Sequence, residues 1–106
     1  MAEWAMRDYT IKAGQFDEWL LAWRNGVLPL RQQFGFEVQA WAVPAESRFV
    51  WVLRYDGPGT YDEADAAYRA SPERAALNPE PADFIAEMRI SRLTPILTDG
   101  QLRDLP

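Results

Sequence analysis

The sequence contains neither cysteine nor histidine among its 106 residues. Without cysteine there can be no disulfide, no thiolate nucleophile and no cysteine-ligated metal. Without histidine the chain lacks the most frequent general base, the most frequent transition-metal ligand and the usual haem ligand. These absences fit a cytoplasmic protein, and we expect no metal site and no cofactor.

Positive charge is also scarce. The 16 Asp and Glu residues outnumber the 11 Lys and Arg residues, the net charge is −5, and the basic residues form no run. Binding to polyanions needs a concentrated positive surface, so we expect neither nucleic acid nor an anionic membrane as a partner. No apolar stretch approaches the ~20 residues that span a bilayer. The first residues, MAEWAMRDYT, lack the basic start and apolar run of a signal peptide.

The clearest structural signal is the stretch from Arg48 to Asp56, which reads RFVWVLRYD. It is β-branched and aromatic and has no Gly or Pro, so it predicts a strand. Because side chains alternate between the faces of a strand, Trp51 and Leu53 share one face and Val50 and Val52 the other. Both faces are mainly apolar, which is typical of a strand in the middle of a covered sheet.

A first strand is predicted over Glu3–Ile11 and a long helix follows it. The helix is indicated by an apolar stripe at spacings of four and three, namely Phe16, Leu20, Trp23, Val27, Leu30 and Phe34. Pro29 cannot donate a hydrogen bond to the carbonyl of Asn25, so we expect a kink or break between these two residues. A bent helix on a sheet is the favoured interpretation, and a gap over a pocket is the alternative.

Phe36–Val43 alternates as a second strand and forms a hairpin with the strand that begins at Arg48. Thr60 and Glu63 have the spacing of a capping box, which predicts a helix to about Ala70. Ser71 and Pro72 then start a short helix that ends near Asn78. The stretch 82–93 contains helix formers, but its alternation favours a strand from about Ile85. Residues 98–106 are polar and aperiodic, and we expect a tail there.

The predicted order is β-α-β-β-α-β, an α+β chain of the ferredoxin-like type. A four-stranded antiparallel sheet would carry both helices on one face, in one domain spanning residues 1–97. The other face would then expose a set such as Val50, Val52 and Tyr9, or a set such as Trp51, Leu53 and Met6. Either patch is larger than a monomer usually exposes, so we expect a homodimer that packs sheet against sheet.

Four pieces of the sequence, RDYTIKAG, VLPLRQQFGF, WVLRYDG and the later LTP, occur in a combination that resembles the NIPSNAP family. The likeness spans about Met6 to Ile96. The resemblance implies the dimeric α/β-barrel superfamily, in which two ferredoxin-like units pack through their sheets. That superfamily includes cofactor-independent monooxygenases, muconolactone isomerases, haem-dependent chlorite dismutases and proteins without known activity. It supplies no agreed catalytic motif for NIPSNAP proteins, and fold alone does not decide function.

Candidate site residues are therefore taken from polar and aromatic positions within the strands. As catalytic groups we consider Asp8 as a base, Tyr9 as a hydrogen-bond donor to an oxyanion, and Arg54 as a residue that binds a carboxylate or enolate oxygen through two donors. Substrate-binding candidates are the strand residues that could stack on or hydrogen bond to a ligand: Trp41, Trp51, Tyr55, Glu87 and Arg89.

A structural interpretation competes with each of these roles. Arg7, Glu87 and Arg89 could form cross-strand ion pairs, which we favour. Most of the five Trp residues would fill the core.

Two functions follow from these observations. The first is a homodimer that binds an apolar small molecule, aromatic or polyketide-like, and transforms it without cofactor by proton abstraction or oxygenation. The second is a non-catalytic ligand carrier or a module that binds a protein partner.

Overall fold

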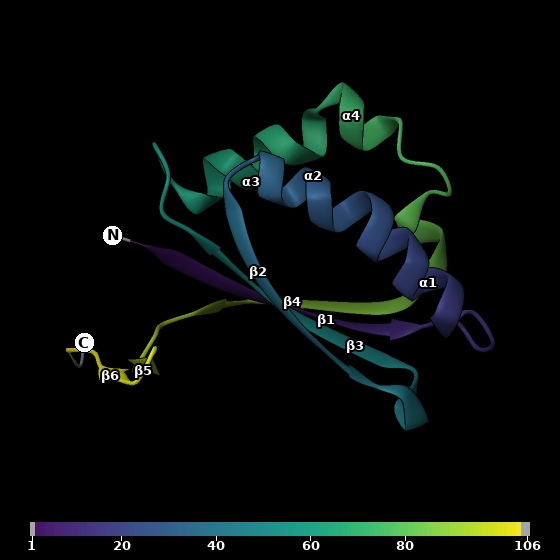
Figure 1. The fold of residues 1–106 in the computed structure, drawn as a ribbon, viewed down its shortest axis with the longest axis horizontal. Helices are drawn as coiled ribbons and strands as arrows, with labels where there is room; N and C mark the ends of the chain where they lie inside the picture. The colour runs from purple at the N-terminus through teal and green to yellow at the C-terminus, as the bar shows by residue number, and fades with distance from the viewer. Residues whose placement is uncertain (1, 105–106) are drawn as a thin grey trace.

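The computed structural model describes residues 2–104. Four strands, β1 (Glu3–Ile11), β2 (Phe36–Val43), β3 (Arg48–Tyr55) and β4 (Ile85–Leu93), form one antiparallel sheet in the order β2-β3-β1-β4. The helices all lie on one side of this sheet (Figure 1). The predicted ferredoxin-like α+β fold is confirmed, with β1 and β3 as its central strands. No helix in the described part of the chain is long and apolar enough to cross a membrane.

The long N-terminal helix is continuous but changes its winding in the middle. It consists of α1 (Phe16–Ala22), the π-helical turn η1 (Trp23–Val27) and α2 (Leu28–Gln33). The backbone N–H of Leu28 donates to the carbonyl of Trp23, which is the wider spacing of a π-helix. The predicted disturbance next to Pro29 is thus a π-turn, because the nitrogen of Pro29 carries no hydrogen to donate to the carbonyl of Asn25. Gly35 has a φ of 92° and follows α2, as expected of a helix-ending glycine.

The second helical segment comprises α3 (Tyr61–Ala70) and the short α4 (Pro72–Ala75). The capping box is present: the Glu63 amide donates to the Thr60 hydroxyl over 3.1 Å, and the Thr60 amide donates to the Glu63 carboxylate over 2.9 Å. The sequence predicted that the short helix would end near Asn78, but α4 ends at Ala75. Residues that precede a proline avoid the helical region, and Pro79 follows Asn78. A 3-10 turn, η3 (Pro81–Phe84), leads into β4.

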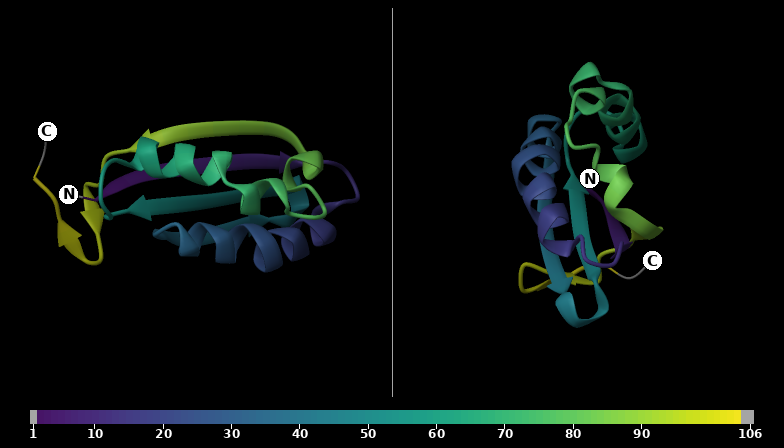
Figure 2. Two further views of the ribbon diagram at one scale, coloured as in Figure 1. Left: turned by 90° about the horizontal axis from the view of Figure 1, so that it is seen from above. Right: turned by 90° about the vertical axis from the view of Figure 1, so that its right-hand side faces the viewer.

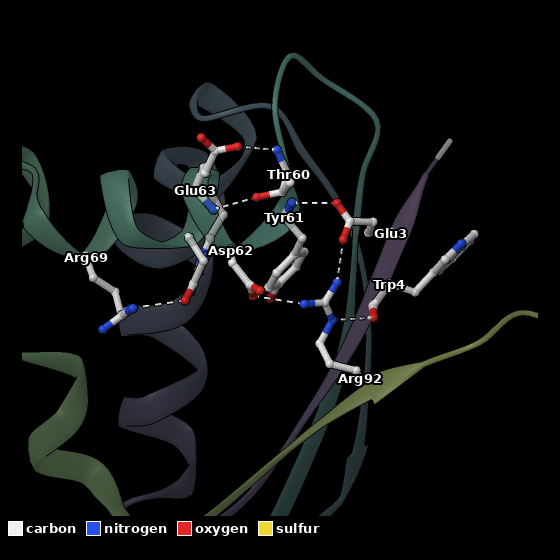
Figure 3. Close-up of polar contacts among 10 residues, drawn as sticks. Glu3, Trp4, Thr60, Tyr61, Asp62, Glu63, Arg69 and Arg92 are labelled. Atoms are coloured by element: carbon white, nitrogen blue, oxygen red, sulfur yellow. Dashed lines mark hydrogen bonds and ion pairs between the residues drawn. The ribbon is translucent and has the colours of Figure 1, made fainter.

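An arginine on the edge strand fixes the start of α3 against the sheet (Figure 3). Arg92 donates to Asp62 and to Glu3, both over 2.9 Å. The other carboxylate oxygen of Glu3 accepts from the Tyr61 amide at 2.7 Å. This network connects β1, β4 and the first turn of α3, so it positions the helix that forms one wall of the cleft described below.

The strand register decides which apolar set the helices cover. Met6 lies opposite Val52, whereas Tyr9 lies opposite Phe49. The helices bury the set that contains Tyr9, Phe49, Trp51 and Leu53. The groupings expected from the sequence, which put Tyr9 with Val52 and Met6 with Trp51, were therefore wrong. They were wrong because the parity of one strand does not determine its alignment with the next.

The chain after β4 forms a small hairpin. Strands β5 (Leu97–Thr98) and β6 (Gln101–Leu102) are joined by Asp99 and Gly100, whose φ values are both positive. Figure 2 shows this hairpin beyond one end of the main sheet. The described part of the predicted tail is thus turned back on itself, while its last residues, 105–106, lie outside the described residues. The boundary at residue 97 stays a prediction.

Candidate functional site

A cleft lies between the helix-facing side of the sheet and the helices. Its hollow has a volume of about 110 Å³. The walls come from β1, β3, β4, both helical segments and η3, and they include four arginines and four aromatic residues: Arg7, Arg31, Arg69, Arg74, Tyr9, Trp19, Trp51 and Tyr68. A narrow space lined by both cations and rings differs from an ordinary apolar core, in which charged groups are rare.

Arg7 projects from β1 into this cleft. Its Nε donates to the hydroxyl of Tyr9 over 2.5 Å, and its guanidinium lies 5.8 Å from the centre of the Trp51 ring. Within residues 2–104 no carboxylate lies within ion-pair distance of Arg7. Burial is the largest single influence and favours the neutral form of Arg7, but Tyr9, Tyr61 and Asp65 together outweigh it and raise the pKa of Arg7 above its ordinary value. Arg7 is therefore a charged group without an ionic partner in the described chain.

Arg31 of α2 is the most deeply buried charge of the cleft, with only 2% of its surface exposed. One of its terminal nitrogens donates to Asp65 of α3 over 2.8 Å, and its guanidinium lies 3.8 Å from the centre of the Tyr68 ring. Arg69 donates to the other oxygen of Asp65 over 3.0 Å. The Nε of Arg31 has no hydrogen-bond partner among the described residues. An N–H donor of the cleft is therefore left unsatisfied.

Two indoles add to this set of unsatisfied donors. The Nε1 atoms of Trp19 and Trp51 are buried and have no partner in the described chain, and both side chains line the cleft. Their rings each pack edge-on against Tyr9, with centroids 5.6 and 6.2 Å away. Buried donors without acceptors are uncommon, and each one costs free energy unless something accepts from it.

An ion pair lies at the outer end of the cleft. Arg74 of α4 donates to both oxygens of Glu80, each over 2.8 Å. Arg69, Arg74 and Glu80 also line a wider surface hollow of about 570 Å³. The cleft and this wider hollow, the mouth, therefore share Arg69 and Arg74 in their walls and lie side by side.

Among residues 2–104, no acidic residue lines the cleft. Asp65, the carboxylate bound to Arg31, has both oxygens occupied by arginines. No group of three or more acidic residues in residues 2–104 is placed to hold a metal ion. The polar groups of the cleft can therefore donate hydrogen bonds and hold negative charge, but no free carboxylate lines it to accept a proton.

The carboxylates that bind these arginines make stability dependent on pH. Burial opposes the charge of Asp65, yet the hydrogen bonds and charges of Arg31 and Arg69 outweigh it and lower the pKa of Asp65. The hydrogen bonds from Arg74 lower the pKa of Glu80. A lowered pKa in the folded state stabilises the fold above the unfolded-state pKa of about 4, and this contribution is lost as the pH falls through the folded-state value.

We expect the urea midpoint of unfolding to be steady between pH 6 and pH 5 and to fall below about pH 4. Glu80→Gln should make this fall shallower. Glu73→Gln is the control. Glu73 is an exposed carboxylate on α4, the helix that carries Arg74, and Glu73 makes none of the ion pairs found in residues 2–104. A midpoint that holds steady to pH 3 would contradict the prediction.

The structure divides the residues predicted as a site between the two faces of the sheet. Tyr9, Trp51 and Tyr55 lie on the helix-facing side. Tyr55 is outside the cleft, and its hydroxyl donates to the carbonyl of Pro58 over 2.7 Å. The other predicted residues alternate with these along the strands and lie on the face that no helix of the described chain covers, called the open face: Asp8, Trp41, Arg54, Glu87 and Arg89. Only Tyr9 and Trp51 of the predicted set come together in the cleft.

Two of the open-face residues are held by charged neighbours. Asp8 accepts from Arg48 at 2.9 and 2.7 Å. These hydrogen bonds lower the pKa of Asp8, so it is ionised and engaged. Arg54 donates to Glu37 over 3.0 Å and to Asp56 over 3.3 Å. Their assigned roles as base and anion holder stay predictions.

The alternative interpretation of Arg7, Glu87 and Arg89 as cross-strand ion pairs was wrong for Arg7 and Glu87, whereas Arg89 lies across from Asp8 and its charge contributes to the lowered pKa of Asp8. Arg7 faces the helices, whereas Glu87 and Arg89 face the other way, so Arg7 cannot meet either of them. None of the three forms an ion pair within residues 2–104. The expectation that most tryptophans fill the core holds for Trp19, Trp23 and Trp51, whereas Trp41 is 54% exposed on the open face.

Sequence reasoning missed Arg31, Tyr68 and Arg74. A signal for Arg31 was present, because it follows Val27 by four residues and lies beside Leu30, on the margin of the apolar stripe of the helix. A charged residue at that position predicts a buried charge with a partner elsewhere. Nothing local to Arg31 indicated that Asp65 would be that partner.

Comparisons with known proteins place the fold. No known protein-family profile matches the sequence, and no curated protein matches it. Solved structures do match. An uncharacterised NIPSNAP domain protein from Burkholderia xenovorans superposes with a TM-score of 0.76 and 21% identity, covering 90% of this chain and 94% of that one.

Two further structures show the breadth of the likeness. A NIPSNAP family protein from Agrobacterium tumefaciens gives a TM-score of 0.77 and 16% identity over 93% of this chain and 95% of that one. A putative antibiotic biosynthesis monooxygenase from Bacteroides thetaiotaomicron gives 0.71 and 12% identity over 96% of both chains. The structural neighbours thus include NIPSNAP proteins and a putative monooxygenase. At these identities the likeness establishes a common fold.

Proposed function

We propose that this protein is a cytoplasmic homodimer that binds a small aromatic molecule in the cleft of each subunit. The observation that carries the proposal is a hollow of about 110 Å³ lined by Tyr9, Trp19, Trp51 and Tyr68, whose lining residues include three buried N–H donors that have no acceptor among residues 2–104. Pockets for small molecules combine such apolar walls with a few convergent polar groups.

The volume limits the size of the ligand. An apolar cavity of about 150 Å³ is known to hold benzene, and pockets for drug-sized molecules measure about 300–1,000 Å³. A hollow of about 110 Å³ is smaller than the cavity that holds benzene, so it can enclose a single-ring ligand only in part, and the rest of the ligand would extend towards the wider hollow beside it. This argues for a single-ring compound over the polyketide-like ligand considered from the sequence.

Catalysis without cofactor is the further part of the proposal. Monooxygenases occur among the structural neighbours, and Tyr9 with Arg7 forms a hydrogen-bonded pair that could stabilise a developing oxyanion. Asp8 and Arg54 lie on the other face with ionic partners, so the cleft reaction proposed here does not use them.

Binding without turnover is the second candidate, and one observation favours it. Proton abstraction needs a base, yet no carboxylate lines the cleft and Asp65 is held by two arginines. A ligand carrier needs only the donors and rings that are present.

The open face of the sheet supports the homodimer. Met6, Val50 and Val52 lie on its two central strands, Trp4 lies near the start of β1 and Trp41 on β2 is 54% exposed. The helices lie on the other side of the sheet (Figure 1). Ion pairs such as Asp8–Arg48 and Arg54–Glu37 lie around this apolar patch. A second copy could bury the same patch on both subunits through a two-fold axis, at a gain of about 25 cal/mol per Å² of apolar area.

The cleft is tested by calorimetric titration with single-ring probes: benzoate, benzamide and benzyl alcohol. We expect saturable binding of at least one probe, one per subunit. Ala82→Trp, which puts a large side chain on a residue lining the cleft, should weaken that binding by about tenfold, which corresponds to about 1.4 kcal/mol. Ala66→Trp on the exposed side of α3 is the control. Equal weakening by both variants, or no binding of any probe at millimolar concentration, would contradict the proposal.

A further inference from the structure

We infer that the cleft selects an anionic head group, the carboxylate of a small aromatic acid, and that the guanidinium of Arg7 is its principal contact. This inference rests on the proposed binding function and specifies its ligand. It follows from the balance of charge in the cleft, from the kind of hydrogen-bonding atoms left over and from the position of Arg7 among the rings.

The charge balance of the cleft is positive. Four arginines line it, and the carboxylates that bind them are Asp65, shared by Arg31 and Arg69, and Glu80, which binds Arg74. Four positive charges minus two negative charges leave a surplus of two. Arg7 has no ionic partner in the described chain, so one of these charges is available. A positively lined, partly dry site attracts anions strongly because the low dielectric strengthens the interaction.

Among the residues that line the cleft, the buried side-chain atoms without a hydrogen-bond partner in the described chain are all donors. They are the Nε of Arg31 and the Nε1 atoms of Trp19 and Trp51. An ionised carboxylate only accepts, and its two oxygens offer about four acceptor sites. Neutral amides and alcohols bring donors of their own, which this cleft cannot satisfy equally well. A cation would add to the positive surplus, so the cleft discriminates against it.

Arg7 is positioned for this role by the aromatic residues beside it. Its Nε is occupied by the Tyr9 hydroxyl, and its terminal nitrogens are left for another acceptor, apart from a 3.7 Å contact with the sulfur of Met88. The guanidinium lies 5.6 and 5.8 Å from the ring centres of Tyr9 and Trp51. A carboxylate bound to Arg7 would therefore place its attached ring against these aromatic walls.

The test compares probes of nearly the same shape and different charge by calorimetric titration at pH 7. Benzoate is an anion, benzamide is neutral and benzylamine is a cation. We expect benzoate to bind at least about tenfold more tightly than benzamide, because hydrogen bonds between charged groups are stronger than neutral ones, and benzylamine not to bind. The affinity for benzoate should also decrease as salt is added.

Variants then assign the selectivity to Arg7. Arg7→Met should lower the affinity for benzoate at least about tenfold and the affinity for benzamide less than about twofold. Arg7→Lys keeps the charge and loses the planar fork, so its affinity for benzoate should be intermediate. Arg24→Met is the control, because it removes one positive charge from an exposed position of η1 outside the cleft. Near-ultraviolet circular dichroism checks that each variant is folded.

The outcomes separate this inference from the proposed function. Equal affinity for benzoate and benzamide, or an equal loss of both in Arg7→Met, would overturn the anion selectivity and leave ligand binding in the cleft intact. Failure of every probe to bind the wild-type protein would overturn both. Benzoate binding that is lost in Arg24→Met as much as in Arg7→Met would indicate a general charge effect and would overturn the role of Arg7.

Discussion

Replacing Arg31 with methionine is expected to lower the free energy of unfolding by about 3 kcal/mol. The guanidinium of Arg31 is 2% exposed and contacts Asp65 over 2.8 Å. Asp65 would keep Arg69 as a partner but would lose its buried hydrogen bond and ion pair with Arg31, and the desolvation that this pair had compensated then opposes folding. Methionine fills much of the same volume, so the loss measures the charge and its hydrogen bond more than a cavity. Urea unfolding at a fixed protein concentration measures the difference.

Arg69→Met is the matched control for this prediction. Arg69 binds the same carboxylate over 3.0 Å, but its side chain is 64% exposed. Solvent screens such a pair, so its removal should cost less than about 1 kcal/mol. If the two variants lose the same stability, the buried position of Arg31 does not decide the energetics and the prediction fails.

Replacing Val52 with glutamate is expected to raise the dissociation constant of the proposed homodimer at least about 100-fold. Val52 lies on the central strand β3, between Met6 on β1 and Gln39 on β2, and it faces away from the helices. In a two-fold sheet-to-sheet interface the change would place two unpaired carboxylates in the contact, one from each subunit. Sedimentation equilibrium over micromolar concentrations measures the dissociation constant.

Ala67→Glu is the control, because it adds the same charge on the exposed surface of α3 and should leave the dimer unchanged. Near-ultraviolet circular dichroism should show that the Val52→Glu subunit keeps its packed aromatic core, which lies on the other face of the sheet. A Val52→Glu protein that dimerises as tightly as the wild type would exclude this face as the interface. A wild-type protein that is monomeric at micromolar concentration would do the same.

The elements that the sequence predicted correctly are those specified locally. The helix α3 begins at the capping box of Thr60 and Glu63, four residues that contain their own hydrogen-bond partners. Strand β4 begins at Ile85 as its alternating pattern indicated, although alanine, glutamate and methionine there favour a helix. Tertiary pairing with β1 outweighs that intrinsic preference, which is small per residue.

The predicted site was the weaker part because it required pairing between distant residues. Asp8 and Tyr9 were considered together, yet as neighbours on one strand they point to opposite faces, and only Tyr9 reaches the cleft. Arg31 was overlooked because its partner, Asp65, lies on another helix and 34 residues away. No local pattern connects such a pair.

The sequence by itself determined the order of strands and helices, the π-turn region around Pro29, the two apolar faces of β3 and the lack of histidine and cysteine chemistry. Each of these features can be recognised from the alternation or helical spacing of neighbouring residues, or from the composition of the chain. Only the tertiary structure decided that Val52 lies opposite Met6 on the open face and that Arg7 enters the cleft without an ionic partner. Strand register and charge pairing are set by contacts between segments far apart in the chain, and one residue of slippage would have exchanged the two faces.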